Sequence, residues 1–260
     1  MKIAAYQFAV SDDIQKNYCI IKKAIYEASK QEVSLLVFPE CCLSGYPHES
    51  IANNDSIDFK LVDTLLGELQ TVSDETKMSL VIGTIFKEGN CVFNRAVVFR
   101  PGMPMASYDK RALWGWDEEN FAKGNNPGVF KINGITVGIR ICFEVRFPEY
   151  FRELYMENTD LNIILFFDVT DDENTDRYNL IKAHLQTRAV ENVCPILSVN
   201  AIEPFQTAPT MFVGKSGQVI AECNRNQENL LVCNFEKTDL NFGEKGRRTL
   251  SDELLGLRMK

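Results

Sequence analysis

The stretch that decides the fold runs from Val137 to Glu149 and has the sequence VGIRICFEVRFPE. Its beginning, Val137 to Ile141, is a short apolar run that predicts a buried β-strand. Phe147-Pro148-Glu149 predicts the start of a helix, because proline is favoured in the first helical turn. Cys142 therefore lies on a turn between a strand and a helix. Peptide N–H groups and the positive end of a helix dipole favour a thiolate and a developing oxyanion there.

Strand and helix patterns alternate on both sides of this stretch. Asn133-Gly134 between two apolar runs is a strong signal for a two-residue hairpin turn. Helical spacing predicts helices over residues 13–31, with Ser11 or Asp12 as the cap, over 57–76 and 175–192, and after Pro148. Predicted strands cover residues 2–8, 34–38, 79–86, 91–99, 129–131, 135–141, 162–167, 195–199, 211–214 and 230–235. The pattern predicts an α/β fold of mixed sheets covered by helices, in a single domain over residues 1–260.

The composition favours a globular protein that acts on small molecules. Hydrophobic residues make up 45% and charged residues 25% of the 260, so the chain is long enough to bury a deep apolar site. The formal net charge is −8, and no long basic run offers a positive stripe to a phosphate backbone. Nucleic acid is therefore disfavoured as a partner.

The cysteine pattern favours a cytoplasmic protein with reduced thiols. The first residues lack the apolar segment of a signal peptide, and no apolar run is long enough to span a membrane. The eight cysteines occur in a chain that is not short, so a disulfide framework is disfavoured. No Cys-x-x-Cys pair occurs, and the histidines are His48 and His184 alone. We therefore expect no metal site.

Glu40 is the candidate base for a thiol nucleophile. His48 and His184 have no recognisable catalytic setting, whereas Glu40 follows the apolar run that Pro39 ends. Strand ends form the rim where α/β active sites gather, and a carboxylate in a partly apolar place has a raised pKa. Considered alone, a solvated glutamate or a helix cap is the more common explanation.

Lys110 ends the predicted strand 107–109, where its ammonium group can stabilise an acyl oxyanion. Taken singly, one of 28 basic residues is more often a solvated surface charge. A single cysteine such as Cys142 is likewise more often a small buried apolar residue. The assignment therefore depends on the combination of these residues.

The combination resembles the nitrilase (carbon–nitrogen hydrolase) superfamily. The resemblance rests on Phe38-Pro39-Glu40 followed by Gly45-Tyr46, on Tyr108-Asp109-Lys110-Arg111, and on residues 141–149 around the cysteine. It continues through His184, residues 188–192 and Asn200, and so covers most of the chain. It implies an α-β-β-α sandwich and a homodimer that forms through the helix after Pro148 and the helix around 180–190.

The same resemblance implies a role for each matching residue. Glu40 is the general base, Lys110 stabilises the oxyanion and Cys142 is the nucleophile that forms a thioester. The peptide N–H of Phe143 completes the oxyanion site. No metal or organic cofactor is implied.

Other positions of the family pattern are less certain in this chain. Many relatives have Asp where this chain has Glu144, and many carry a second carboxylate after the lysine. Counting back from Gly124 places that carboxylate at Asp117, with Glu118 and Glu119 adjacent. The segments that line the pocket in the family correspond here to Tyr46, Trp114, Trp116, Phe167 and Asp168. For the two tryptophans, loop anchoring by apolar packing is an equal alternative.

The leading functional hypothesis is hydrolysis of a small linear carboxamide to a carboxylate and ammonia. An N-carbamoyl compound is the next substrate class and a nitrile the third, since nitrilases commonly have Trp where this chain has Phe143. Acyl transfer from the thioester is a different enzyme class. A binding dimer that has lost catalysis is the non-enzymatic alternative.

Overall fold

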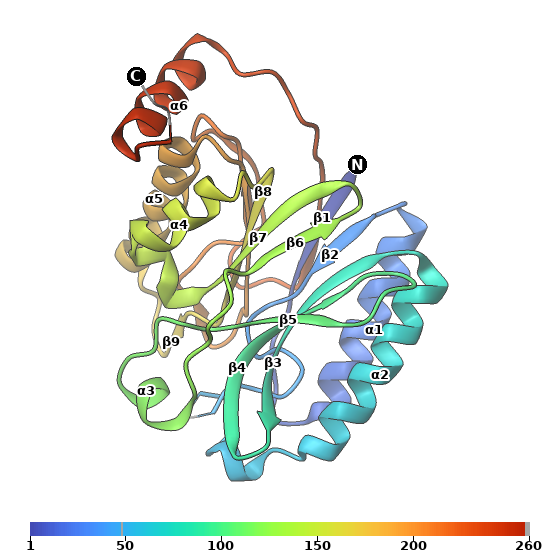
Figure 1. Ribbon diagram of the computed structural model, residues 1–260. Coiled ribbons are helices and arrows are strands. Elements are labelled where there is room, and N and C mark those ends of the chain that lie inside the picture. Colours follow the sequence, from blue (N-terminus) through green and yellow to red (C-terminus); the bar gives the residue numbers. More distant parts are fainter. Residues whose placement is uncertain (48, 258–260) are drawn as a thin grey trace.

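The chain forms two six-stranded β-sheets that pack face to face, with helices on both outer faces (Figure 1). This computed structural model describes residues 1–47 and 49–257, so His48 lies outside the described residues. The layers confirm the predicted α-β-β-α sandwich. Both sheets are mixed, because each combines parallel with antiparallel pairs.

The first sheet contains the strands that lead to Glu40 and Lys110. Its order is β14-β1-β2-β3-β4-β5, and β2 pairs in parallel with both β1 and β3. The strands are β1 (Lys2–Gln7), β2 (Leu35–Val37), β3 (Ser79–Glu88), β4 (Cys91–Phe99), β5 (Ala106–Asp109) and β14 (Asn229–Asn234).

The second sheet contains the strand that leads to Cys142. Its order is β13-β12-β10-β8-β7-β6, and β8 pairs in parallel with both β7 and β10. The strands are β6 (Val129–Ile132), β7 (Ile135–Ile141), β8 (Leu161–Phe166), β10 (Ile196–Asn200), β12 (Met211–Val213) and β13 (Val219–Glu222). A separate short pair joins β9 (Val169–Thr170) to β11 (Phe205–Gln206). The predicted hairpin is confirmed, since Asn133 and Gly134 both have positive φ between β6 and β7.

The helices cover the sheets from outside. The first sheet carries α1 (Ile14–Lys30) and α2 (Phe59–Thr76), and the second carries α4 (Pro148–Met156) and α5 (Thr175–Asn192). Asp13, not Ser11 or Asp12 as predicted, caps α1, because its side chain accepts the N–H of Lys16. The remaining elements are α3 (Trp116–Asn120), α6 (Phe242–Leu254), η1 (Asn54–Ser56) and η2 (Cys142–Arg146). Within the described residues, no helix has the length and apolar character that crossing a membrane requires.

Alternation along the inner strands builds three apolar layers. On β1, Ile3 and Ala5 point toward the second sheet, whereas Ala4 and Tyr6 pack under α1. A strand inside this sandwich is therefore buried on both faces, which explains the continuous apolar runs in the sequence. Phe151 and Leu185 close the third layer, between the second sheet and its helices.

Gly83 brings the first sheet close to the segment that carries Glu40. A Cβ atom at this position of β3 would lie 2.3 Å from the carbonyl oxygen of Pro39 and 2.6 Å from the Cα of Glu40. Both contacts are with backbone, which cannot rotate away as a side chain can. A glycine here therefore fixes how closely the chain passes after β2.

We expect Gly83→Ala to lower the melting temperature by roughly 2–12 °C, since overpacking of this kind costs about 1–3 kcal/mol. It should also lower kcat/KM, because the backbone of Glu40 must move. Gly67→Ala is the matched control, since Gly67 lies on the exposed face of α2 with no neighbouring atom within 4 Å. Thermal unfolding of both variants tests this expectation, and equal melting temperatures would contradict it.

Candidate active site

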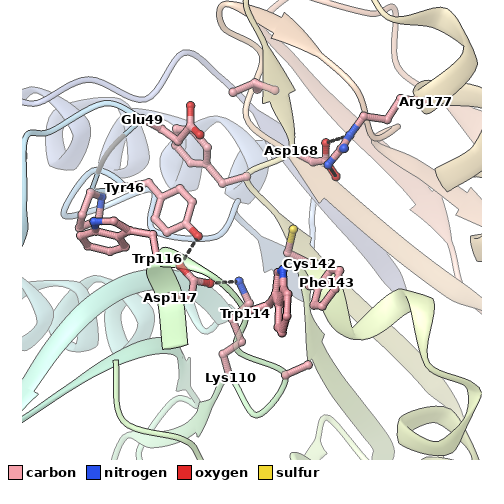
Figure 2. Close-up of a pocket in the computed structure, with 14 residues that line it drawn as sticks. Tyr46, Glu49, Lys110, Trp114, Trp116, Asp117, Cys142, Phe143, Asp168 and Arg177 are labelled. Atoms are coloured by element: carbon pink, nitrogen blue, oxygen red, sulfur yellow. Dashed lines mark hydrogen bonds and ion pairs between the residues drawn. The ribbon is translucent and has the colours of Figure 1, made fainter. Parts of the chain in front are cut away.

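Three strand ends deliver the candidate residues to one pocket. Glu40 follows β2, Lys110 directly follows β5 and Cys142 directly follows β7. Lys110 and Cys142 line a cavity of about 250 Å³, and Glu40 lies beneath it, bonded to Lys110. Figure 2 shows its walls, and the lining side chains are Tyr46, Pro47, Glu49, Lys110, Ala112, Trp114, Trp116, Asp117, Cys142, Phe143, Phe167, Asp168, Val169 and Arg177.

The ammonium group of Lys110 is buried between two carboxylates. Its Nζ lies 2.9 Å from Oε1 of Glu40 and 2.7 Å from Oδ2 of Asp117, and the side chain is only 3% exposed. Burial by itself lowers the pKa of Lys110, but the neighbouring acidic groups, Glu40 first and Asp117 among the smaller contributors, outweigh burial and raise it well above its ordinary value. The lysine therefore stays protonated.

Both oxygens of Glu40 are held. Oε1 accepts hydrogen bonds from Lys110 and from Nδ2 of Asn94 at 2.7 Å, and Oε2 accepts the backbone N–H of Phe167 at 2.8 Å. Burial raises the pKa of Glu40 above its ordinary value, although Lys110 and Asn94 oppose this shift and Asp117 adds to it. Glu40 thus has the character of a base that exchanges protons closer to neutral pH than a solvated carboxylate.

Cys142 lies on a strained turn at the pocket. Its φ of 44° is in the left-handed region that non-glycine residues seldom adopt, a kind of strain that gathers at functional sites. The expectation that the turn would favour thiolate is wrong for the free protein. Burial and the charge of Glu40 raise the pKa of the Cys142 thiol well above its ordinary value. Cys142 is also the first residue of the five-residue η2, so it does not adjoin the start of α4 at Pro148.

Glu144 connects the cysteine strand to the lysine strand. The carboxylate is fully buried, and it accepts the N–H of Ile141 at 2.7 Å and the N–H of Arg111 at 2.8 Å. It also accepts the hydroxyl of Tyr108 at 2.7 Å. The residues beside Cys142 and Lys110 are thus bonded to one side chain. From the sequence, Glu144 was only a departure from the family pattern.

Of the three acidic candidates, Asp117 is the one that reaches Lys110. It is buried on α3, whereas Glu118 and Glu119 are exposed. Its second oxygen accepts the hydroxyl of Tyr46 at 2.6 Å. Tyr46 therefore holds the oxygen of Asp117 that does not bond the lysine.

The aromatic candidates line the pocket in two ways. Trp114 lines the pocket and is 74% exposed. Trp116 also lines the pocket and packs edge-on against Phe121, with ring centroids 5.5 Å apart. Tyr46 and Phe167 pack together with centroids 5.2 Å apart. Phe143 lines the wall next to Cys142. Trp116 thus both anchors its loop and lines the pocket, whereas the exposed side chain of Trp114 is accessible to a substrate.

The sequence matches the family described as Carbon-nitrogen hydrolase over residues 2–240. The chain belongs to this family. A nitrilase of Pyrococcus abyssi is 30% identical over 253 residues, which cover 90% of this chain and 91% of the relative. An N-carbamoylputrescine amidase of Arabidopsis thaliana is 23% identical, over 90% of this chain and 86% of the relative.

Solved structures support the same membership. An amidase from Nesterenkonia sp. matches with a TM-score of 0.77 and 26% identity, over 89% of each chain. A mutant of the amidase from Nesterenkonia sp. AN1 carries the acetamide moiety of fluoroacetamide, covalently added at its active-site cysteine. That structure matches this carbon–nitrogen hydrolase with a TM-score of 0.77 and 26% identity, over 89% of each chain.

Two further residues of this hydrolase were not predicted from its sequence. Asn94 on β4 bonds Glu40, and Arg177 on α5 lines the pocket and pairs with Asp168. Asn94 bonds a residue 54 positions away, and the pairing of Arg177 with Asp168 depends on how the segment before α5 folds, so no helix or strand pattern marked either residue. Within residues 1–47 and 49–257, no group of three or more His, Cys, Asp or Glu side chains is placed to hold a metal ion.

We expect Asp117→Asn to lower kcat/KM about 10- to 100-fold, the effect of losing a hydrogen bond between charged groups. Because the charge of Asp117 raises the pKa of Glu40, its removal lowers that pKa, and the acid limb of the kcat/KM profile should move to lower pH. Glu118→Gln and Glu119→Gln are the matched controls and should retain the parent profile. An unchanged profile for Asp117→Asn would remove this residue from the site.

Proposed function

We propose that this carbon–nitrogen hydrolase cleaves small linear carboxamides to a carboxylate and ammonia through a Cys142 thioester. The observation that carries the proposal is the buried Lys110 ammonium, paired with Glu40 and Asp117 in the pocket that Cys142 lines. A cavity of about 250 Å³ suits a small substrate. The amidase from Nesterenkonia sp. AN1, with its fluoroacetamide adduct, supports the same chemistry.

In the first half of the reaction, Glu40 takes the proton of the Cys142 thiol, and the sulfur attacks the amide carbon. The carbonyl oxygen becomes an oxyanion that accepts hydrogen bonds from Nζ of Lys110 and from the N–H of Phe143. Protonated Glu40 then donates its proton to the amide nitrogen. The C–N bond breaks, ammonia leaves and a thioester remains.

In the second half, water replaces ammonia. Glu40 is ionised again and takes a proton from the water, whose oxygen attacks the thioester carbon. The same two donors stabilise the second oxyanion. The C–S bond then breaks, Glu40 returns its proton to the sulfur and the carboxylic acid leaves.

N-carbamoyl compounds and nitriles are the alternative substrates, because each also presents an electrophilic carbon that is bonded to nitrogen to the thiol. The Arabidopsis N-carbamoylputrescine amidase supports the first and the Pyrococcus nitrilase the second. A screen for ammonia release over short amides, dicarboxylate monoamides, carbamoyl amino acids and nitriles distinguishes these classes. Release of a new amide when an amine is added would instead indicate acyl transfer, and no turnover at all would leave a binding dimer.

Cys142→Ala should abolish turnover, and Glu40→Gln and Lys110→Ala should each lower kcat by at least about 100-fold. Thermal unfolding of each variant separates catalytic loss from unfolding, because removing Lys110 leaves two buried carboxylates unpaired. Near-parent kcat in folded Glu40→Gln would exclude this glutamate as the base.

Iodoacetamide labelling provides a second readout for the nucleophile. Cys19 and Cys91 are the exposed thiols, so they are first replaced by serine. In that background Cys142 should be the first of the remaining six to be labelled, as read by intact-mass spectrometry. Adding Glu40→Gln should slow this labelling, because the thiol then has no base.

We also propose that the enzyme forms a homodimer through α4 and α5 and works in the cytoplasm. Leu180 on α5 and Met156 at the end of α4 are 48% and 46% exposed, which is apolar area that a partner subunit can cover. Eight free cysteines suit a reducing compartment.

Light scattering at micromolar concentration should give a dimer mass, and Leu180→Glu should give a monomer mass. Thr71→Glu on the exposed face of α2, where no contact is proposed, is the matched control and should remain a dimer. A monomer mass for the parent protein would contradict the proposed assembly.

A further inference from the structure

A second ion pair lies in the pocket, separate from the lysine cluster that Lys110 forms with Glu40 and Asp117. Nε of Arg177 donates to Oδ1 of Asp168 at 2.8 Å, and its Nη2 donates to Oδ2 at 3.1 Å. Figure 2 shows Cys142 between this pair and the Lys110–Asp117 pair, with its sulfur directed toward Asp168. A substrate bound at the sulfur therefore has the lysine cluster at one end and Arg177 at the other.

Asp168 is fixed by its surroundings and has little left to offer a ligand. Oδ1 accepts the hydroxyl of Thr207 in addition to Nε of Arg177, and Oδ2 accepts Nη2. The backbone of Asp168 is held as well, since its N–H and its carbonyl both bond the side chain of Asn200. Asp168 thus serves as a rigid support for the guanidinium.

Arg177 lines the pocket and keeps donors that Asp168 does not use. Among the described residues, no hydrogen bond from its Nη1 is formed, and the side chain is 42% exposed. The hydrogen bonds that Arg177 donates to Asp168 raise the pKa of Arg177, so the guanidinium is charged. A planar guanidinium held in this way is suited to bind a carboxylate.

The pocket is better suited to bind a substrate carboxylate at Arg177 than a substrate ammonium group at its acidic side chains. Asp117 already bonds Lys110 and Tyr46, and Asp168 already accepts two bonds from Arg177 and one from Thr207. Glu49 is exposed and lines the same cavity, so an aminoalkyl amide is the competing substrate.

We propose that Arg177 determines substrate specificity by binding a carboxylate at the far end of the substrate. The substrate is then the monoamide of a short dicarboxylic acid, with its amide at Cys142 and its carboxylate at the free edge of the guanidinium. This inference rests on the proposed amidase function and assigns Arg177 to binding, with no part in bond breaking.

Succinamate, butyramide and γ-aminobutyramide test the inference, because they share a chain length and differ in the charge of the far end. The parent should prefer succinamate. Arg177→Gln should lower the ratio of kcat/KM for succinamate to that for butyramide about 10- to 100-fold, mainly through KM. Arg177→Lys should restore part of this ratio, and Arg100→Gln, outside the pocket, is the matched control.

Calorimetry supplies a readout that does not depend on turnover. Succinate should bind the Cys142→Ala protein, and adding Arg177→Gln should weaken that binding by a similar factor. If the parent releases no ammonia from these amides but succinate binding follows this pattern, the proposed function fails and the carboxylate site stands. If butyramide or γ-aminobutyramide is the better substrate, or the ratio is unchanged in Arg177→Gln, the inference is overturned and the amidase function stands.

Discussion

The buried ammonium of Lys110 is the constraint on which the rest of the site depends. A charge removed from water costs several kcal/mol unless it is paired and hydrogen-bonded. Glu40 and Asp117 provide the pairing, but each carboxylate then needs partners for its other oxygen. The N–H of Phe167 and the hydroxyl of Tyr46 meet that need. One buried lysine thus requires segments from both sheets and from the loop that follows it to meet at a single point.

The fold brings these segments together through contacts that tolerate little change. Glu144 accepts N–H groups from the chain next to Cys142 and next to Lys110, so one carboxylate sets the spacing between these two residues. Gly83 permits the approach of the segment that carries Glu40. The N–H of Glu40 bonds the carbonyl of Phe166 at 3.3 Å, which joins the end of β2 to the end of β8 in the other sheet. The sandwich therefore acts as a rigid frame around the pocket.

Local patterns in the sequence were sufficient for most of the fold, because apolar runs and helical spacing are local properties. They missed α6, whose Gly243 and Gly246 weaken the helical signal and whose Phe242 and Leu254 face solvent. The positions of Glu40, Lys110 and Cys142 followed from strand ends and family resemblance. The partners Asn94 and Glu144 did not, because they bond residues 54 and 33 positions away along the chain. Arg177 did not either, because its pairing with Asp168 depends on how the segment between β8 and α5 folds. Even Asp117, seven residues from Lys110, required the start of α3 to fix which acidic side chain turns inward.

The second carboxylate has a physical reason in the proposed cycle. At rest, two carboxylates and one ammonium leave the cluster with one net negative charge, while the thiol is neutral. Each later step moves a proton or a bonding electron pair among the substrate and the groups of the site, so that net charge is constant and only its position changes. Whenever Glu40 holds the proton, its neutral side chain no longer balances the charge of Lys110. Without Asp117, neither carboxylate would then pair with the ammonium until the oxyanion forms. Asp117 takes no part in these proton transfers, so its ion pair with Lys110 supports the ammonium while Glu40 repeatedly gains and loses a proton.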